Sequence, residues 1–99
     1  MEIKKTHIVV SLAGRDKDRP FVVVETENDF VYLVDGKLRK LEAPKKKRRK
    51  HVAFAGQLGE RLSGKLLRED KVLNSEIRRA LAEFTAEAGG DDAASSRRR

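Results

Sequence analysis

Three basic side chains, Arg15, Lys17 and Arg19, follow Gly14 at alternate positions. They lie between an apolar segment that ends at residue 13 and another that begins at residue 21. Glycine adopts backbone conformations that other residues avoid, so Gly14 allows the chain to reverse sharply between two strands. Such a hairpin tip can straddle phosphate groups, because arginine offers bidentate contacts and lysine supplies a compact positive charge. The alternative is a solvated hairpin tip that binds nothing.

A second basic segment follows Pro44. It consists of six consecutive basic residues and a histidine: Lys45, Lys46, Lys47, Arg48, Arg49, Lys50 and His51. Six neighbouring positive charges repel one another and would remain solvated by themselves. The apolar stretch Val52–Phe54 indicates the end of a strand that would hold the segment against a folded domain. A flexible tail or a nuclear import signal is the alternative, but the position inside the predicted domain favours a binding surface, to which Arg39 and Lys40 contribute.

Aromatic side chains that could stack on nucleic-acid bases are few, at 5% of the residues. The four within the predicted β region are Phe21, Phe30, Tyr32 and Phe54. Because a core must also be filled, we expect most of them to be buried and at most one to be free for stacking. Tyr32 is the residue that we expect to be free.

No set of residues predicts catalysis or metal binding. The chain has no cysteine, which excludes disulfides, thiol catalysis and zinc ribbons. His7 and His51 are far apart in sequence and lack companions at metal-ligand spacing. Gly56, Gly59 and Gly64 lack the strand and the Lys-Ser/Thr pair of a phosphate-binding loop. We therefore expect a protein that is not an enzyme and that needs neither cofactor nor metal.

The positive charge is concentrated in the N-terminal half. The net charge is +7, from 23 Lys and Arg against 16 Asp and Glu. Residues 1–54 hold 14 basic and 8 acidic side chains, a charge of +6, whereas residues 55–99 hold 9 and 8, a charge of +1. A field of this sign favours polyanions, of which nucleic acid is the most common. An anionic membrane surface is the rival, but Arg78 and Arg79 are too few beside the neighbouring glutamates for a basic amphipathic helix.

Several short strands must position the basic segments. β-Branched and apolar runs without helical period predict strands over residues 7–13, 22–27, 30–34 and 37–41, with a last strand ending at residues 52–54. Asn28-Asp29 and Asp35-Gly36 predict tight turns between them, since Asp-Gly is a strong hairpin signal. Short strands joined by polar turns predict a small barrel, whose closure removes exposed edges.

Helical structure is expected only in the C-terminal part. Leucines recur at every fourth position in residues 55–73, but three glycines interrupt them, each costing about 1 kcal/mol inside a helix. A broken or partner-induced helix is as consistent with this pattern as a stable one. Asn74 is a good N-cap residue and predicts a helix start, Gly89 predicts its end, and Ile77, Leu81 and Phe84 fall on one face. The chain is thus divided into a barrel over 1–54, a helical extension over 55–88 and a disordered tail over 89–99.

The first strands and turns resemble a known motif. Val10–Lys17, the strand Phe21–Glu25 and the turn Val34-Asp35-Gly36 look like the KOW motif. They are similar to the KOW domains of certain large-subunit ribosomal proteins of archaea and eukaryotes, and to their short bacterial relatives. The resemblance covers about residues 7–54, with Gly14 at the invariant glycine and Lys17 at the basic loop position. A second glycine commonly follows that lysine, and this chain has Asp18 there instead.

The resemblance implies an SH3-like five-stranded barrel that binds ribosomal or other structured RNA. We therefore expect an RNA-binding protein, associated with the ribosome, monomeric when free and cytoplasmic, because no segment predicts a signal peptide or a membrane span. The rival is a protein-interaction module that docks on ribosomal proteins or RNA polymerase. Its binding face would be the apolar stripe of Ile77, Leu81 and Phe84, free in the isolated chain.

Overall fold

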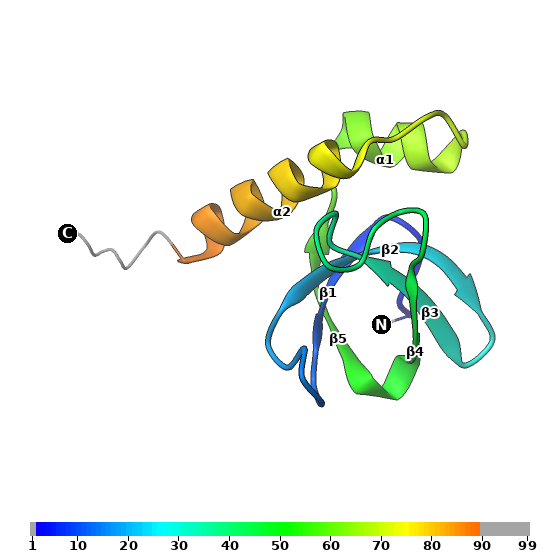
Figure 1. The fold of residues 1–99 in the computed structure, drawn as a ribbon, viewed down its shortest axis with the longest axis vertical. Coiled ribbons are helices and arrows are strands. Elements are labelled where there is room, and N and C mark those ends of the chain that lie inside the picture. The colour runs from blue at the N-terminus through cyan, green and yellow to red at the C-terminus, as the bar shows by residue number, and fades with distance from the viewer. Residues whose placement is uncertain (1, 90–99) are drawn as a thin grey trace.

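The computed structural model of this chain describes residues 2–89. It has one sheet of five antiparallel strands, followed by two helices (Figure 1). The strands are β1 (His7–Ser11), β2 (Pro20–Glu27), β3 (Phe30–Val34), β4 (Lys45–Arg48) and β5 (Val52–Gln57). A short 3-10 turn, η1 (Arg49–His51), joins β4 to β5, and the helices are α1 (Glu60–Leu67) and α2 (Asn74–Gly89). The predicted mainly β class with a helical C-terminal extension is confirmed.

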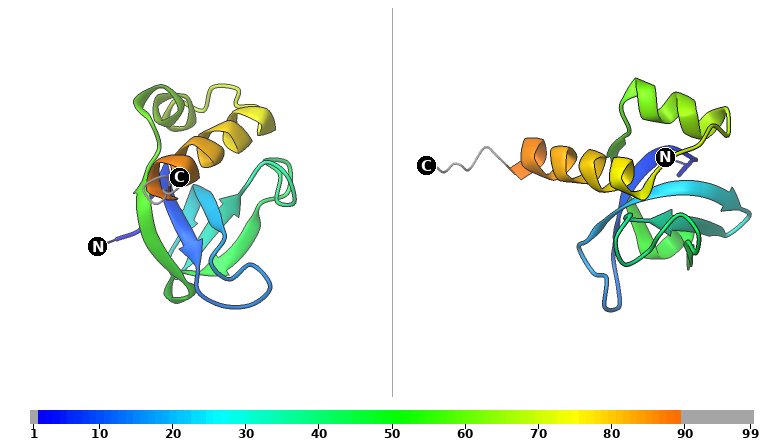
Figure 2. Two further views of the ribbon diagram at one scale, coloured as in Figure 1. Left: turned by 90° about the vertical axis from the view of Figure 1, so that its left-hand side faces the viewer. Right: turned by 45° about the horizontal axis from the view of Figure 1, so that its top comes forward.

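The sheet is strongly curved, with the strand order β4-β3-β2-β1-β5. Figures 1 and 2 show both helices at one end of the sheet and the turn between β4 and β5 at the other end. The two edge strands, β4 and β5, do not pair with each other among residues 2–89. Closure of this sheet into a barrel therefore stays a prediction.

The hairpin between β2 and β3 forms where the sequence predicts it. β3 has the predicted limits, and Glu27 pairs with Phe30 across the turn of Asn28 and Asp29. Asn28 has a φ of 46°, in the left-handed region that asparagine tolerates well. β1 ends two residues earlier than predicted, and β5 continues to Gln57.

The prediction of a strand over residues 37–41 is wrong, because this segment is a loop. The buried carboxylate of Asp35 accepts hydrogen bonds from the backbone N–H groups of Lys37 (2.9 Å) and Arg39 (2.8 Å). Asp35 and Gly36 thus start an irregular loop instead of a two-residue hairpin turn. The strand that pairs with β3 on the side away from β2 is the basic segment itself, with Phe30 opposite Arg48.

Apolar side chains cover both faces of the sheet, since successive residues of a strand point to opposite sides. One cluster lies within the curve of the sheet and consists of Ile3, Val9, Phe21, Val23, Val31, Leu33 and Val52. A second cluster joins the other face to the helices and consists of Ile8, Val22, Val34, Leu58, Leu62, Leu66, Ile77 and Leu81. The helical extension is therefore packed on the sheet through a shared core.

The apolar stripe of α2 faces this second cluster. Ile77 and Leu81 are buried, and Phe84 packs against the cluster at its edge. Gly56 makes room for Phe84, because a Cβ atom at residue 56 would lie 2.6 Å from Phe84 Cε1. The stripe is thus covered by the protein's own sheet and is not the free binding face that the rival hypothesis requires.

The segment whose order the sequence left open contains a regular helix. Leu62 and Leu66 of α1 are buried one turn apart, which anchors this short helix on the shared core. The disordered tail predicted for residues 89–99 lies outside the described residues, apart from Gly89 at the end of α2.

The start of α2 differs from the prediction in its capping residue. The Leu73 carbonyl accepts the N–H of Glu76 at 2.9 Å, so Leu73, not Asn74, takes the N-cap position. The Glu76 carboxylate reaches back to the Leu73 N–H at 2.9 Å, as in half of a capping box. The Asn74 side chain instead accepts the N–H of Leu41 (2.8 Å) and donates to Glu42 (3.0 Å). Asn74 therefore holds the β3–β4 loop against α2.

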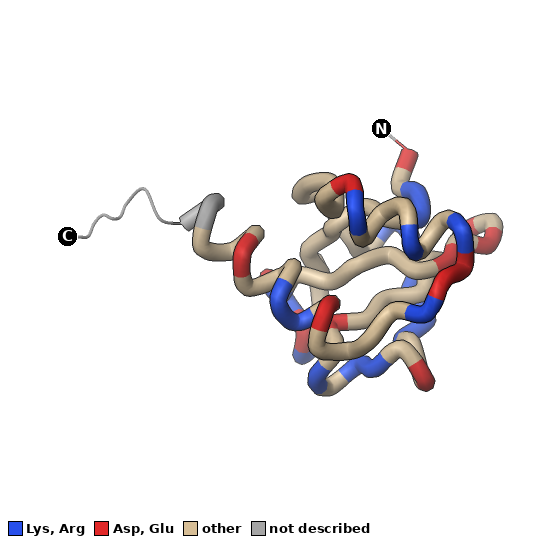
Figure 3. The backbone as a smooth tube through the Cα atoms, turned by 90° about the horizontal axis from the view of Figure 1, so that it is seen from above, with Lys and Arg blue, Asp and Glu red and all other residues tan. Residues whose placement is uncertain are grey.

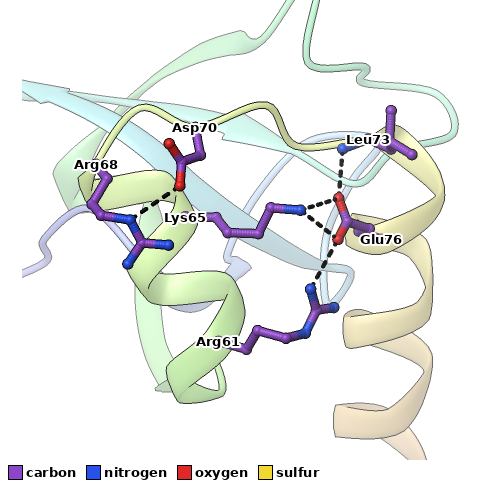
Figure 4. Close-up of polar contacts among 6 residues, drawn as sticks. All are labelled: Arg61, Lys65, Arg68, Asp70, Leu73 and Glu76. Atoms are coloured by element: carbon purple, nitrogen blue, oxygen red, sulfur yellow. Dashed lines mark hydrogen bonds and ion pairs between the residues drawn. The ribbon is translucent and has the colours of Figure 1, made fainter.

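Glu76 also joins the two helices. Its carboxylate lies 3.0 Å from Lys65 Nζ and 3.3 Å from Arg61 Nη1, both on α1 (Figure 4). The hydrogen bond from the Leu73 N–H, followed by that from Lys65, lowers the pKa of Glu76 from its ordinary 4.5 to about 2. This carboxylate is consequently charged throughout the physiological pH range.

Candidate nucleic-acid interface

The basic segment folds as an edge strand, so its side chains alternate between two sides. In β4, Lys46 and Arg48 are exposed, whereas Lys45 and Lys47 are half-buried. Among the described residues, only Lys46 of the six consecutive basic residues lies within 4 Å of a carboxylate, that of Glu27 at 3.8 Å. The strand therefore presents positive charges that acidic side chains leave largely unneutralised.

The exposed side of β4 combines basic and aromatic groups. Lys46 Nζ lies 4.3 Å and Arg48 Cζ 5.3 Å from the centroid of the Phe30 ring. A cation over an aromatic face is attracted by the ring quadrupole, so Phe30 orders these two side chains on the surface. Tyr32 donates a hydrogen bond to Glu27 at 2.6 Å, and this bond raises the pKa of Tyr32.

The other side of β4 reaches the loop that contains Gly14. Lys47 Nζ donates a hydrogen bond to the Ala13 carbonyl at 3.2 Å. The N–H of Leu12 donates to the His51 carbonyl at 2.8 Å, which fixes the loop to η1. The two basic segments are separated by some 30 residues in sequence and lie side by side in the fold.

Arg49 has a structural role within the basic segment. Its guanidinium donates to the Ile3 carbonyl at 2.6 Å and also to the Asn28 carbonyl. These bonds tie η1 to the N-terminus and to the β2–β3 turn. Lys50 is exposed next to it, and His51 is half-buried.

The Gly14 loop (residues 12–19) has a compact backbone. Gly14 has a φ of 81° and Asp18 a φ of 69°, so both lie in the left-handed region. The N–H of Asp18 donates to the Ser11 carbonyl at 2.8 Å, which closes the loop at its base. Arg15 and Lys17 are exposed and form no ion pair with any described residue. Asp18 thus adopts a left-handed conformation, which aspartate tolerates better than most residues other than glycine.

Arg19 and Arg39 connect two loops through ion pairs. Arg19 lies 3.7 Å from Asp35, and Arg39 lies 3.8 Å from Asp16, with both aspartates largely buried. These contacts cross between the Gly14 loop and the β3–β4 loop. The charges of Arg19 and Arg39 are therefore partly neutralised within the protein, whereas Lys40 of the same set is exposed.

The aromatic residues are distributed differently from the prediction. Phe21 is buried, but Phe30 and Tyr32 are half-buried and Phe54 is 40% exposed. The expectation that most of them lie in the core is wrong. In β3, Phe30 and Tyr32 alternate with the buried Val31 and Leu33. Phe54 lies on the same face of β5 as the buried Val52, and it is exposed because β5 is an edge strand of the sheet. The most exposed is Phe54, not Tyr32, and the apolar run Val52–Phe54 gives no local signal of this exposure.

The remaining chemistry is limited. The residues described by the structure contain no group of three or more His, Cys, Asp or Glu side chains positioned to hold a metal ion. None of the described helices is both long and apolar enough to cross a membrane. Figure 3 shows basic and acidic positions interspersed along the helices, unlike the consecutive basic residues of β4. The chemistry that this arrangement supports is the binding of a polyanion by the exposed cations of β4, η1 and the Gly14 loop.

No family model matches the sequence, and no curated protein is similar to it.

Proposed function

We propose that this chain is an RNA-binding protein, with a KOW-type SH3-like barrel that binds ribosomal or other structured RNA on the ribosome. The strand order β4-β3-β2-β1-β5 and the 3-10 turn between the edge strands support this assignment. The left-handed φ values of Gly14 and Asp18 also support it, because these are the two positions where the motif has or commonly has glycine, the residue that adopts such values most freely.

The observation that carries the proposal is the contact between the two basic segments. The hydrogen bond from Lys47 to the Ala13 carbonyl joins the Gly14 loop, which carries Arg15 and Lys17, to the basic edge strand. Cations of the loop and of the edge strand can then contact neighbouring phosphates of a folded RNA, and each contact adds to the electrostatic gain. Six adjacent cations without such a surface would bind nucleic acid with little preference for its shape.

The expected mode of recognition is through the RNA backbone. Lysine and arginine contacts to phosphates position a protein on RNA, whereas base-edge contacts specify sequence. The two exposed side chains of β4 are the cations Lys46 and Arg48, and within a paired RNA helix the deep, narrow major groove keeps such side chains from the base edges. Affinity should therefore depend strongly on salt and weakly on sequence.

A comparison of two triple variants tests the proposal. The first, K46A/R48A/K50A, removes exposed cations of the basic segment and leaves the structural Arg49 in place. The second, R68A/K71A/R79A, removes three exposed cations near the helices and serves as a control with the same net charge. Binding to a structured fragment of large-subunit ribosomal RNA is measured by fluorescence anisotropy at several salt concentrations.

We expect the first variant to lower the salt slope by about 2, since each phosphate contact contributes about 0.7 to 0.9. The control should keep the wild-type slope within experimental error. Equal effects of the two variants would contradict the assigned surface, and the absence of RNA binding by the wild type would contradict the function itself.

Association with the ribosome has a separate test. Cell lysate is sedimented through sucrose gradients at low and at high salt, and the protein is detected in each fraction. Co-migration with the large subunit at low salt, with release at high salt, is the expected result. Its absence from all ribosomal fractions would limit the proposal to RNA outside the ribosome.

A further inference from the structure

An open groove lies beside η1, on the surface next to the basic segment. It has a volume of about 580 Å³ and is lined by the apolar residues Ile3, Val52, Ala53 and Phe54 and by one acidic residue, Glu2. Arg49 and Lys50 contribute positive charge to the same groove. The size falls within the range of about 300 to 1,000 Å³ that is typical of small-ligand sites.

Phe54 is the aromatic residue that gives this groove its character. Its side chain is 40% exposed, although a phenylalanine on a strand is more commonly buried. The His7 ring contacts it edge to face, with the centroids 4.9 Å apart, and so limits the movement of the Phe54 ring. Burial, and then the charge of Lys4, lower the pKa of His7, so its ring is neutral at pH 7.

Two other aromatic rings of the sheet, those of Phe30 and Tyr32, are half-buried and less suited to stack on a base. Lys46 and Arg48 both lie over the Phe30 ring, and the Tyr32 hydroxyl is held by Glu27. None of the cation–π contacts in the described part of the chain involves Phe54.

The cations beside the groove are positioned to take an anion. Arg49 is fixed by its bonds to the Ile3 and Asn28 carbonyls, which use two of the five N–H donors of its guanidinium. Lys50 is exposed, and neither residue lies within 4 Å of a carboxylate among the described residues. A ligand that combines a flat apolar ring with a negative charge fits this set of groups.

We propose that this groove binds one unpaired nucleotide of an RNA, with its base stacked on Phe54 and its phosphate held by Arg49 and Lys50. This inference rests on the proposed function and adds a preference to it. A base can reach Phe54 only where it is not paired, as in a bulge, a loop or a single strand. The protein should therefore select RNA that places an unpaired nucleotide beside a helix.

Two RNA hairpins that differ in a single nucleotide provide the test. One is fully paired in its stem, and the other carries one bulged nucleotide in the same stem. We expect the wild type to bind the bulged hairpin more tightly. F54A and F54L should lower the affinity for the bulged hairpin by about 5- to 150-fold, the effect of losing one stacked base. Both should leave the affinity for the paired hairpin unchanged, and F54W should preserve the preference.

A second measurement uses only the wild-type protein, so its result does not depend on whether the Phe54 variants fold. The bulged nucleotide is replaced by 2-aminopurine, whose fluorescence decreases when its ring stacks on another. Saturation with protein should quench this fluorescence, and addition of the same protein to a hairpin with 2-aminopurine inside the paired stem should not.

The failures of the two proposals are distinguishable. Equal binding of both hairpins, with no effect of F54A and no quenching, would overturn the nucleotide site while leaving backbone binding intact. Binding to neither hairpin, nor to any structured ribosomal RNA, would overturn the proposed function together with the site that rests on it.

Discussion

Asp18 brings a negative charge into the Gly14 loop at a residue whose backbone is left-handed. Its φ of 69° is one that aspartate and asparagine adopt more readily than most other residues. The residue is exposed between Lys17 and Arg19, where its charge opposes the attraction of the loop for phosphate. Asparagine at this position separates the two effects, because it tolerates the left-handed backbone as aspartate does but carries no charge.

We therefore expect D18N to bind RNA more tightly than the wild type at low salt. The stability of the protein should change little, because the backbone tolerance is retained. The gain in affinity should fade toward 1 M salt, where the screening length is about 3 Å. Anisotropy titrations across a salt series measure this effect, and a weaker affinity of D18N at low salt would argue against phosphate contact at the loop.

Gly14 and Gly36 both have left-handed φ values, 81° and 77°, but their surroundings differ. A Cβ atom at residue 14 would meet nothing within 4 Å, whereas one at residue 36 would overlap the Asn74 carbonyl and lie 3.0 Å from Arg78 Cγ. G14A should thus cost only backbone strain, about 1 to 2 kcal/mol. G36A should cost clearly more, because α2 must shift away from the loop. Urea unfolding of both variants checks this order, and equal costs would contradict the described packing of Gly36.

At the scale of elements, α2 organises the loop that precedes the basic strand. Asn74 bonds the Leu41 N–H and the Glu42 carboxylate, and Arg78 donates to the Gly36 carbonyl at 2.7 Å. The helix thereby sets the path of the chain from β3 into β4. The helical extension is consequently part of the folded unit that presents the basic segment.

The connection between α1 and α2 should depend on pH through Glu76. Its folded-state pKa of about 2 lies below the ordinary 4.5, so its contribution to stability is fully present above about pH 4.5. This contribution is lost as the pH falls from 4.5 toward 2, because the unfolded state takes up a proton in this range that the folded state does not bind. E76Q should be less stable than the wild type at pH 6, and the difference should disappear near pH 2. Urea unfolding at a series of pH values measures it, and a difference that persists unchanged at pH 2 would contradict the ionic role.

For the molecule as a whole, the turns and strands that depend on neighbouring residues could be predicted from the sequence. The Asn28-Asp29 turn and β3 follow from turn residues and from the alternation of apolar side chains. The loop over residues 37–41 was not predictable, because it depends on the Asp35 carboxylate and on Asn74, which lies 33 residues beyond Leu41 in sequence. Tertiary contacts of this kind override local strand propensity.

In the candidate site, too, local features could be predicted from the sequence and those that depend on tertiary contacts could not. The sequence identified both basic segments and predicted one last strand ending at residues 52–54. It did not predict that residues 45–48 form a separate edge strand, since lysine has a low strand propensity. The backbone of β3 supplies the hydrogen bonds that make it a strand. The ion pairs of Arg19 and Arg39 and the exposure of Phe54 also arise from the fold, so no pattern along the chain reveals them.

An NMR titration tests, residue by residue, whether RNA binds beside β4, η1 and the Gly14 loop, as we propose. The 15N-labelled protein is titrated with a structured fragment of large-subunit ribosomal RNA, and the backbone amide signals are followed. We predict that the signals of residues 12–19 and 45–54 shift and that those of α1 and the exposed side of α2 do not. Shifts confined to the helices, or no shifts at saturating RNA, would contradict the account.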